Sequence, residues 1–514
     1  MARKNRKNSQ NDPALIFTPP SKPADSVPNP LTLDATQLLA AYRTGLYRPS
    51  QVVERCIALI GHANPKLNFL VEDRFDAALA EAITSDERWK RGEPEGELDG
   101  VPITIKESFD VAGMKTTGCM TYLRDHVAET DAGAVARLRA AGAIVLGKTN
   151  TPALCFCQET ENTLYGRTNN PWNPLRTVGG SSGGEAVAVS LGAAAFGLGS
   201  DIGGSIRLPA SFCGVVGYKA GPAAFPYDGH FPTPELSQKE TIRMLGYGPL
   251  TRSVRDARRI AQILNPDADP IPERARVGRV HVIGGFSRTR LHPDVEKILQ
   301  HAGAALRVVS EDVEERVPPF LAETPMAWQR IMSLDGARDI AKLAYPSRFP
   351  RLAGHPARAA ADYARALAGL PTEQHRYLSW ALIGAFMFAP SRREWRDTQA
   401  HLETGFAWLH DRLSGGGVIL SPVYPEPALP HGEVYAGLFS LKLTVQHLLP
   451  YVSLVNVFGL PALVVPSGFC SQGMPIGLQL TTLPGQEWAL FTAGLQLEKA
   501  LGGALRNHFW DPGN

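Results

Sequence analysis

The sequence has almost no excess of either charge, because its 514 residues carry 52 basic and 50 acidic side chains. Such a balance offers no broad field to hold a polyanion, which argues against nucleic acid as a partner. Cysteine is also scarce, with six residues scattered along the chain. That number excludes a disulfide scaffold and favours a reducing compartment, so we expect a cytoplasmic protein. Cys155 and Cys157 lack the spacing and the histidine partners of a zinc site, so we expect no metal.

Long hydrophobic runs are missing as well. The longest stretch with few charges, 186–200, is too short and too rich in glycine and alanine to cross a bilayer. The basic start of the chain has no apolar run behind it, so it does not resemble a signal peptide. The sequence therefore predicts no membrane span.

The overall composition is that of a globular protein, with 44% apolar and 20% charged residues. Residues 1–30 are rich in proline and poor in large apolar side chains, so we expect a disordered tail there and a fold that begins near Leu31. Residues from about 270 to 450 contain less glycine, show a mostly helical pattern and carry many aromatic side chains. Most of these aromatics must be core, but some could line an apolar pocket.

Hydrophobic periodicity outlines helices first and then an alternation of strands and helices. Helices are predicted at 34–45 and from a capping Ser50 to a stop before Pro65. β-Branched residues then predict a strand within 99–108, and a second, buried strand within 143–150 runs into a polar loop. A short helix is predicted between these strands. This alternation is typical of an α/β fold with helices packed on a sheet.

Two motifs suggest functions that their surroundings contradict. Residues 142–149 match the G-x-x-x-x-G-K-[ST] spacing of a phosphate-binding loop, but the four middle residues, Ala-Ile-Val-Leu, look like the strand itself. Residues 179–183 match the G-x-S-x-G of a hydrolase nucleophile elbow, but hardly an apolar run precedes them, so the required strand is missing. Neither nucleotide binding nor an elbow is favoured.

A third serine, Ser205, has a better setting for catalysis. It follows two glycines, which allow a sharp turn and leave consecutive N–H groups uncovered, as an oxyanion hole requires. A serine hydroxyl needs a base, and none of the 13 histidines stands near these loops in the sequence. Lys106 ends an apolar run; such a lysine is usually a surface residue, but burial would lower its pKa toward the range in which a neutral amine acts as a base.

Several stretches together resemble the amidase signature family. They are DGVPITIKESFDVAGMKTTG (99–118), GKTNTP (147–152), YGRTNNPWNPLRTVGGSSGGEAVAV (165–189), GLGSDIGGSIRLPASFCGVVGYKA (197–220), GPLTRSVRDA (248–257) and NVFGLPALVVPSGFCSQGMPIGLQL (456–480). The resemblance spans most of 31–505 and is weakest in the aromatic region. It implies a single domain over 31–510, in which helices cover both faces of a large mixed, mostly parallel, twisted β-sheet. It also implies a variable, mostly helical substrate-pocket region at about 270–450.

The same resemblance implies a Ser–cis-Ser–Lys triad. Ser205 would be the nucleophile, Ser181 on a cis peptide the proton relay, and Lys106 the general base. The oxyanion would be held by the N–H groups of Ile202, Gly203, Gly204 and Ser205. The supporting residues would be Gly180, Ser182, Asp201 and Arg207. No cofactor is implied.

The expected activity is cofactor-free hydrolysis of a small-molecule amide through an acyl-enzyme. The aromatic region suggests an apolar acyl or aryl group, and esters or carbamates (urethanes) are expected as side reactions. The alternative is the transamidating subunit of a glutamine-dependent tRNA amidotransferase, a relative with the same triad. Glu185 and the long aromatic region resemble the free-standing amidases more. A monomer and a homodimer both remain open.

Overall fold

The computed structural model of the protein describes residues 28–222, 224–232, 239–268, 270–286, 289–346, 355–387, 389–434, 449–504 and 506–512. The tail expected at 1–30 lies outside these residues except for its last three. Within the described residues, regular structure starts with a short 3-10 helix at Pro30–Thr32.

Three helices open the fold: α1 (Ala35–Arg43), α2 (Pro49–Leu67) and α3 (Phe75–Arg91). The predicted limits of α2 were wrong at both ends. The helix starts at Pro49, since a first-turn residue needs no N–H, and the Ser50 hydroxyl bonds to Asp86 instead of capping. Pro65 lies inside the last turn, where it removes only one intrahelical hydrogen bond, to the exposed Gly61.

Eleven strands of the described chain form one sheet, in the order β1-β3-β2-β6-β8-β7-β12-β13-β11-β9-β10. In chain order they are β1 (Leu70–Asp73), β2 (Pro102–Lys106), β3 (Ile144–Thr149), β6 (Phe196–Asp201), β7 (Val216–Lys219), β8 (Gly246–Thr251), β9 (Val280–Val282), β10 (Val313–Glu315), β11 (Val418–Pro422), β12 (Ala462–Phe469) and β13 (Pro475–Thr481). A separate small hairpin joins β4 (Glu161–Asn162) and β5 (Gly166–Arg167). The two strands expected from the sequence are β2 and β3. Residues 144–149 of the supposed phosphate-binding loop form β3, which confirms that the motif is no such loop.

The sheet is mixed, as expected, but its pairings are not mostly parallel. Parallel pairs lie on both sides of β2 and of β9, whereas the six other pairings, which include those of the central strands, are antiparallel. Part of the reason is the short turn between β12 and β13, because only antiparallel neighbours can be joined by a tight hairpin.

Helices cover both faces of the sheet, as expected. On β7, a Cβ at Gly217 would touch Ala210 of α6 (Arg207–Cys213), while the next residue, Tyr218, contacts Phe491 of α17 (Glu487–Leu501). Successive strand residues point to opposite faces, so α6 and α17 lie on opposite sides of the sheet. Helix α5 (Gly183–Leu191) packs on the central strands and against α6, and all its residues are buried.

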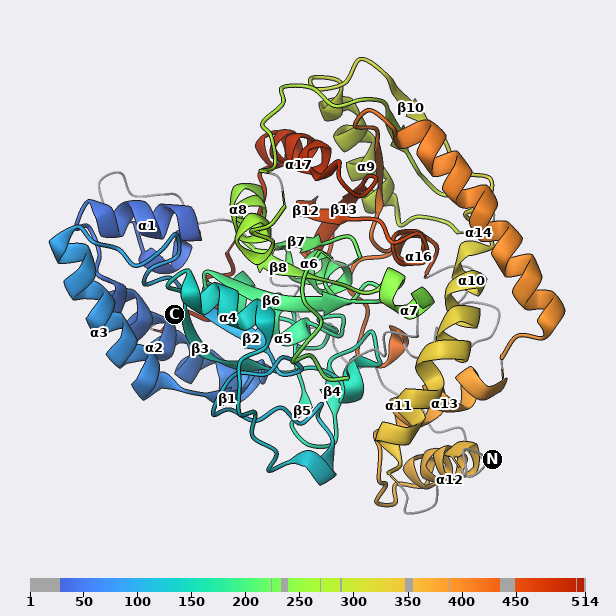
Figure 1. Cartoon of the computed structure of the whole chain (residues 1–514), viewed down its shortest axis with the longest axis horizontal. Coiled ribbons are helices and arrows are strands. Elements are labelled where there is room, and N and C mark those ends of the chain that lie inside the picture. Colours follow the sequence, from blue (N-terminus) through green and yellow to red (C-terminus); the bar gives the residue numbers. More distant parts are fainter. Residues whose placement is uncertain are drawn as a thin grey trace, which may run out of the picture.

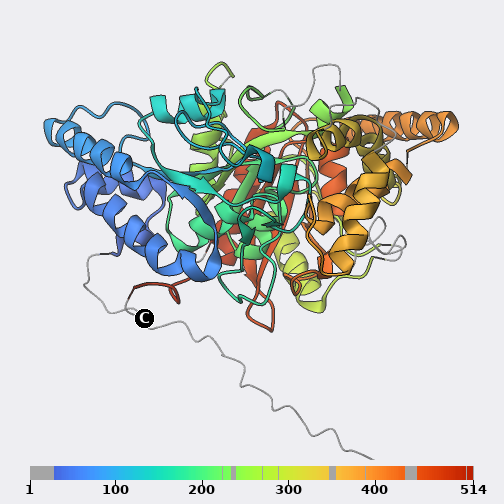
Figure 2. The ribbon, with the colours of Figure 1, turned by 90° about the horizontal axis from the view of Figure 1, so that it is seen from below.

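The remaining helices complete the two layers and one end of the molecule. They are α4 (Gly133–Ala140), α7 (Lys239–Met244), α8 (Val254–Leu264), α9 (Pro293–Leu306), α10 (Thr324–Ile331), α11 (Ala337–Ala344), α12 (His355–Leu367), α13 (Arg376–Met387), α14 (Arg392–Leu413) and α16 (Pro450–Val457). Helices α1–α3 lie at one end and α10–α14 at the other, with the sheet between them (Figures 1 and 2). The stretch 270–450 is mostly helical where it is described, but its strands β9, β10 and β11 belong to the main sheet. No helix of the described residues is long and apolar enough to cross a membrane.

Candidate active site

Lys106 is the last residue of β2, a strand that has neighbours on both sides in the sheet. Its side chain is fully buried, whereas a lysine at the end of a strand is usually exposed to solvent. Burial lowers the pKa of Lys106. The neighbouring Cys155, and after it Asp201 and Glu185, oppose that shift only in part. The condition that the sequence left open, a lysine withdrawn from water, is therefore met.

The Lys106 amine lies against two serine hydroxyls. Its Nζ is 2.7 Å from Ser181 Oγ and 2.9 Å from Ser200 Oγ. The peptide bond between Gly180 and Ser181 is cis, as the resemblance implied. Position 180 has no space for a side chain, because a Cβ there would stand 2.8 Å from the backbone atoms Cys157 O and Glu159 N.

Ser205 lies in the loop that follows β6, next to the cis-peptide segment. The Ser182 N–H donates to the Ser205 carbonyl oxygen at 3.0 Å, and this bond ties the two serine segments together. Among the described residues, no hydrogen bond joins Ser205 Oγ to Ser181 Oγ. The structure thus places Lys106 and Ser181 in direct contact and brings Ser205 beside them through the backbone. No strand precedes Ser181 within 168–180, which confirms that the segment is not a nucleophile elbow.

Asp201 organises the loop that carries Ser205. Its carboxylate accepts the N–H groups of Gly204 at 2.8 Å and Ile206 at 3.1 Å, and it pairs with Arg207 at 3.0 Å. Burial alone would raise the pKa of Asp201, but the Arg207 charge and hydrogen bonds hold it well below its usual range. Asp201 and Arg207 are both fully buried, and their contacts are structural, as expected for a scaffold. Because the Gly204 N–H already donates to Asp201, it is not a free donor for an oxyanion. Of the predicted donors, the N–H groups of Ile202, Gly203 and Ser205 are left.

The sequence reasoning missed two groups at this site, Ser200 and His230. His230 Nε2 lies 3.0 Å from Ser200 Oγ and 3.2 Å from Ser108 Oγ, and its Nδ1 lies 3.1 Å from the Pro232 carbonyl oxygen. A carbonyl only accepts, so Nδ1 carries the proton and Nε2 accepts a hydroxyl hydrogen. Burial, followed by the Lys106 charge, lowers the pKa of His230 to about 3, so the ring is neutral. Ser200 could have been noticed beside Asp201, but nothing in the sequence pointed to His230.

Glu185 lies on α5 behind the lysine. It accepts hydrogen bonds from the hydroxyls of Thr104 on β2 and Thr149 on β3. Burial raises the pKa of Glu185 to about 8. Gly197 on β6 leaves room for this carboxyl group, since a Cβ there would overlap it. The residue thus joins α5 to the strands that position Lys106.

The comparisons with known proteins identify the family of the chain. The amidase family model matches residues 51–491. Fatty-acid amide hydrolase 2 of Homo sapiens is 30% identical over 531 aligned residues, which cover 95% of this chain and 94% of that protein. The chain belongs to the amidase family. The motif resemblance is therefore confirmed, and the protein is an enzyme that hydrolyses amide C–N bonds.

Proteins with other names are also similar to this chain over most of its length. A glutamyl-tRNA(Gln) amidotransferase subunit of Thermosynechococcus vestitus (strain NIES-2133 / IAM M-273 / BP-1) is 32% identical over 480 aligned residues, covering 88% of this chain and 94% of that protein. The solved structure of 6-aminohexanoate cyclic dimer hydrolase complexed with substrate superposes with a TM-score of 0.74 at 27% identity, over 92% of this chain and 97% of that one. Family membership therefore fixes the reaction class but not the substrate.

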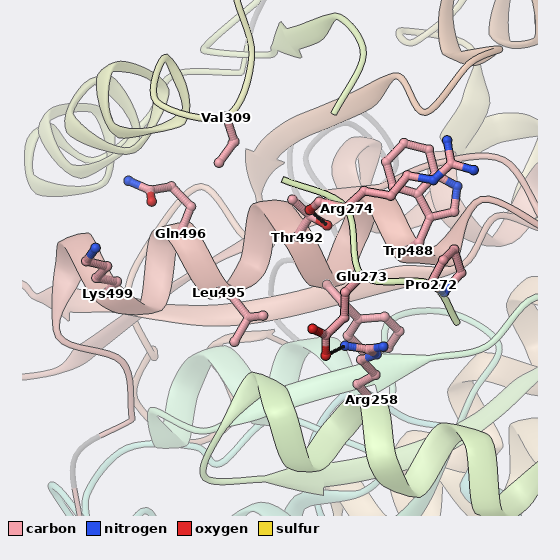
Figure 3. Close-up of a pocket in the computed structure, with 11 residues that line it drawn as sticks. Arg258, Pro272, Glu273, Arg274, Val309, Trp488, Thr492, Leu495, Gln496 and Lys499 are labelled. Carbon is pink, nitrogen blue, oxygen red and sulfur yellow. Dashed lines mark hydrogen bonds and ion pairs between the residues drawn. The ribbon is translucent and has the colours of Figure 1, made fainter. Parts of the chain in front are cut away.

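Figure 3 shows one cavity of this amidase, of about 280 Å³, whose lining includes neither Lys106 nor the serines of the candidate site. It is lined by residues of α8, α17 and the segment around Arg274, whose guanidinium stacks on Trp488. None of its lining residues belongs to the candidate site or to the aromatic region between 320 and 440. The described residues contain no cluster of His, Cys, Asp or Glu that could hold a metal.

Proposed function

We propose that the protein hydrolyses amides with Ser205 as nucleophile, Ser181 as proton relay and Lys106 as general base. The observation that carries this proposal is the 2.7 Å contact between the buried Lys106 amine and Ser181 Oγ. A neutral amine can take the Ser181 proton, and Ser181 can in turn take the Ser205 proton. This direction of transfer requires a lysine whose pKa is lowered, which burial provides.

The Ser205 oxygen then attacks the amide carbonyl carbon, and the carbonyl oxygen becomes an oxyanion held by the N–H groups of Ile202, Gly203 and Ser205. The relay returns the proton to the leaving nitrogen as the C–N bond breaks, which leaves an acyl-enzyme. In the second half of the reaction, water attacks the ester carbonyl carbon while the relay takes its proton. The bond between this carbon and Ser205 Oγ then breaks, the carboxylic acid leaves, and the relay returns the proton to Ser205 Oγ. No cofactor takes part in these steps.

His230 supports this scheme by fixing the role of Ser200. With Nδ1 bonded to the Pro232 carbonyl, the Ser200 hydroxyl donates to Nε2, so its oxygen accepts from Lys106. One amine hydrogen is thereby directed to Ser200, and the lone pair of the neutral amine is left for the proton of Ser181.

For the substrate, we propose a small amide with an apolar acyl or aryl group, with esters and carbamates as side substrates. Two relatives support the aliphatic form: one is named for fatty-acid amides and the other for the 6-aminohexanoate cyclic dimer. The aromatic side chains of α10–α14 are consistent with an apolar pocket. A cytoplasmic location, a monomer or homodimer, and a single domain over 31–510 stay predictions from the sequence.

The similarity to the glutamyl-tRNA(Gln) amidotransferase protein supports a second candidate function. In that case the chain would be a transamidating subunit that works only in a complex. The two functions differ in what the purified chain does alone. A free-standing amidase cleaves a medium-chain fatty-acid 4-nitroanilide without a partner. Release of ammonia from glutamine only when a partner is added, with no anilide cleavage, would reverse the choice.

A fluorophosphonate probe tests the nucleophile directly. Peptide mapping by mass spectrometry should place the label on Ser205, and Ser205→Ala should abolish labelling. Ser182→Ala is the matched control, since Ser182 lies in the neighbouring segment and should leave the label in place. A label on Ser181 or Ser182, or none on the folded wild-type chain, would contradict the proposal.

A further inference from the structure

Two successive peptide groups in the loop after β6 are each fixed by a side chain from another part of the chain. The Trp328 indole N–H, on α10, donates to the Ile202 carbonyl oxygen at 2.8 Å. The Gln158 carboxamide donates to the Gly203 carbonyl oxygen, also at 2.8 Å. The first bond holds the peptide between Ile202 and Gly203, and the second holds the peptide between Gly203 and Gly204.

The two peptide groups differ at their N–H ends. A trans peptide is planar and its C=O and N–H point in opposite directions, so fixing the oxygen also aims the N–H. The Gly203–Gly204 peptide is held at both ends, because its N–H donates to Asp201 at 2.8 Å. The Ile202–Gly203 peptide is held only at its oxygen, and within the described residues the Gly203 N–H has no hydrogen-bond partner. The direction of this N–H therefore depends on Trp328.

The indole ring also lies against the loop itself. A Cβ built on Gly203 would stand 2.8 Å from a carbon of the Trp328 ring. Only glycine at this position lets the ring approach closely enough for its N–H to reach the Ile202 oxygen. Trp328 is partly buried and packs against both large apolar clusters of the core, so its ring has little freedom to move.

We propose that Trp328 is a positioning residue of the oxyanion hole. Its indole N–H aims the Gly203 N–H at the oxygen of the tetrahedral intermediate, and α10 is thereby coupled to catalysis. This inference rests on the proposed function. Loss of one oxyanion donor costs about 10²–10³-fold in kcat. If the Gly203 N–H remains but loses the hydrogen bond that supports its peptide, kcat should fall less, by about tenfold.

The experiment compares Trp328→Phe with Trp408→Phe on the full chain. Trp408 lies on α14 of the same helical end. Its ring contacts His281 and Phe320, and none of its contacts within the described residues reaches the loop. For Trp328→Phe we expect kcat to fall about tenfold and KM to change less than twofold. The Ki of an alkyl trifluoromethyl ketone, which forms a tetrahedral adduct with the serine, should rise by the same factor as kcat falls. Trp408→Phe should change none of these values more than twofold.

A second variant removes only the donor. Incorporation of 3-benzothienylalanine at 328 keeps the bicyclic shape but replaces the N–H by sulfur, and it should reproduce the fall in kcat even if Trp328→Phe folds poorly. An unchanged kcat in this variant, or a rise in KM alone, would overturn the proposal, as would an equal loss in Trp408→Phe. Fluorophosphonate labelling distinguishes a failure of this inference from a failure of the proposed function. Ser205 should remain labelled in every variant. If Ser205 of the wild type is not labelled, the proposed function is refuted instead.

Discussion

The loops around Lys106 are buried, whereas the helical end formed by α10–α14 is buried only in part, and different forces hold the two regions. Around Lys106, donors and acceptors pair at 2.7–3.1 Å, as between Lys106 and Ser181 or between Gly204 and Asp201. In the helical end and beside it, rings pack on rings, such as Phe320 on Phe458 at 5.1 Å. Hydrogen bonds are directional and lose strength quickly when bent, whereas apolar packing tolerates changes that conserve volume.

This difference explains why the loops around Lys106 contain recognisable sequence motifs and the helical end does not. A hydrogen-bonded site requires particular residues at particular positions, so its segments form recognisable motifs. A packed helical end requires only apolar volume, so its sequence is free to change with the substrate. Trp328 is an exception, because its ring packs with the helices while its N–H bonds to the loop.

Among substitutions in the loops around Lys106, Ser205→Ala should have the largest effect on activity. Without the hydroxyl no acyl-enzyme forms, so kcat/KM on a fatty-acid anilide should fall by at least ~10³-fold. Unfolding monitored by circular dichroism should show an unchanged Tm, since no side-chain hydrogen bond of Ser205 is found in the described part of the chain. Residual activity above one percent in a pure preparation would show that another group attacks the carbonyl.

Lys106→Ala should come next, with a loss of at least ~10²-fold, because general-base catalysis contributes roughly 10²–10⁴-fold. The wild type should also lose activity as the pH falls. Burial lowers the pKa of Lys106, and the base works only when neutral, so kcat/KM is full above that pKa and declines below it. A pH–rate profile that stays flat down to pH 5 would argue against Lys106 as the base.

Asp201→Asn tests the scaffold through stability. It leaves the buried Arg207 charge without its carboxylate partner, which should lower the free energy of unfolding by about 3–5 kcal/mol in urea titrations. Because the pKa of Asp201 is lowered in the folded state, the wild-type carboxylate stabilises the fold above its unfolded pKa. That stabilisation is lost as the pH falls through the lower pKa that Asp201 has in the folded protein. An equally stable variant at pH 7 would mean that the pair is dispensable.

Local sequence indicated Ser205 and raised Lys106 as a candidate base, whereas the role of Ser181 came only from the family resemblance. What the sequence missed has physical causes. Lys106, Ser181 and Ser205 stand in segments whose glycines and strand ends dictate the backbone. His230 was missed because it reaches Ser200 only through tertiary folding, from a loop with no catalytic pattern. The Gly204 N–H was misassigned because the sequence does not show that Asp201 turns back to accept it. The antiparallel central strands were missed because strand patterns do not reveal which neighbours pair.

His230→Leu tests the part of the site that the sequence did not indicate. It removes the acceptor that fixes the Ser200 hydroxyl, so the Lys106 lone pair loses its fixed direction and kcat should fall about tenfold. KM should stay within twofold in steady-state kinetics. A change in KM alone would assign His230 to packing.

The smallest expected effect separates the two adjacent serines. Ser182 Oγ makes one long bond, to the Ser200 carbonyl oxygen at 3.3 Å, whereas its N–H makes the 3.0 Å bond that positions Ser205. Ser182→Ala keeps the N–H, so kcat should fall only a few-fold, and far less than in Ser181→Ala. Steady-state kinetics of the two variants side by side decide the matter. If Ser182→Ala proves as damaging as Ser205→Ala while Ser181→Ala stays active, the proton passes through Ser182, and the 2.7 Å contact with Lys106 is structural.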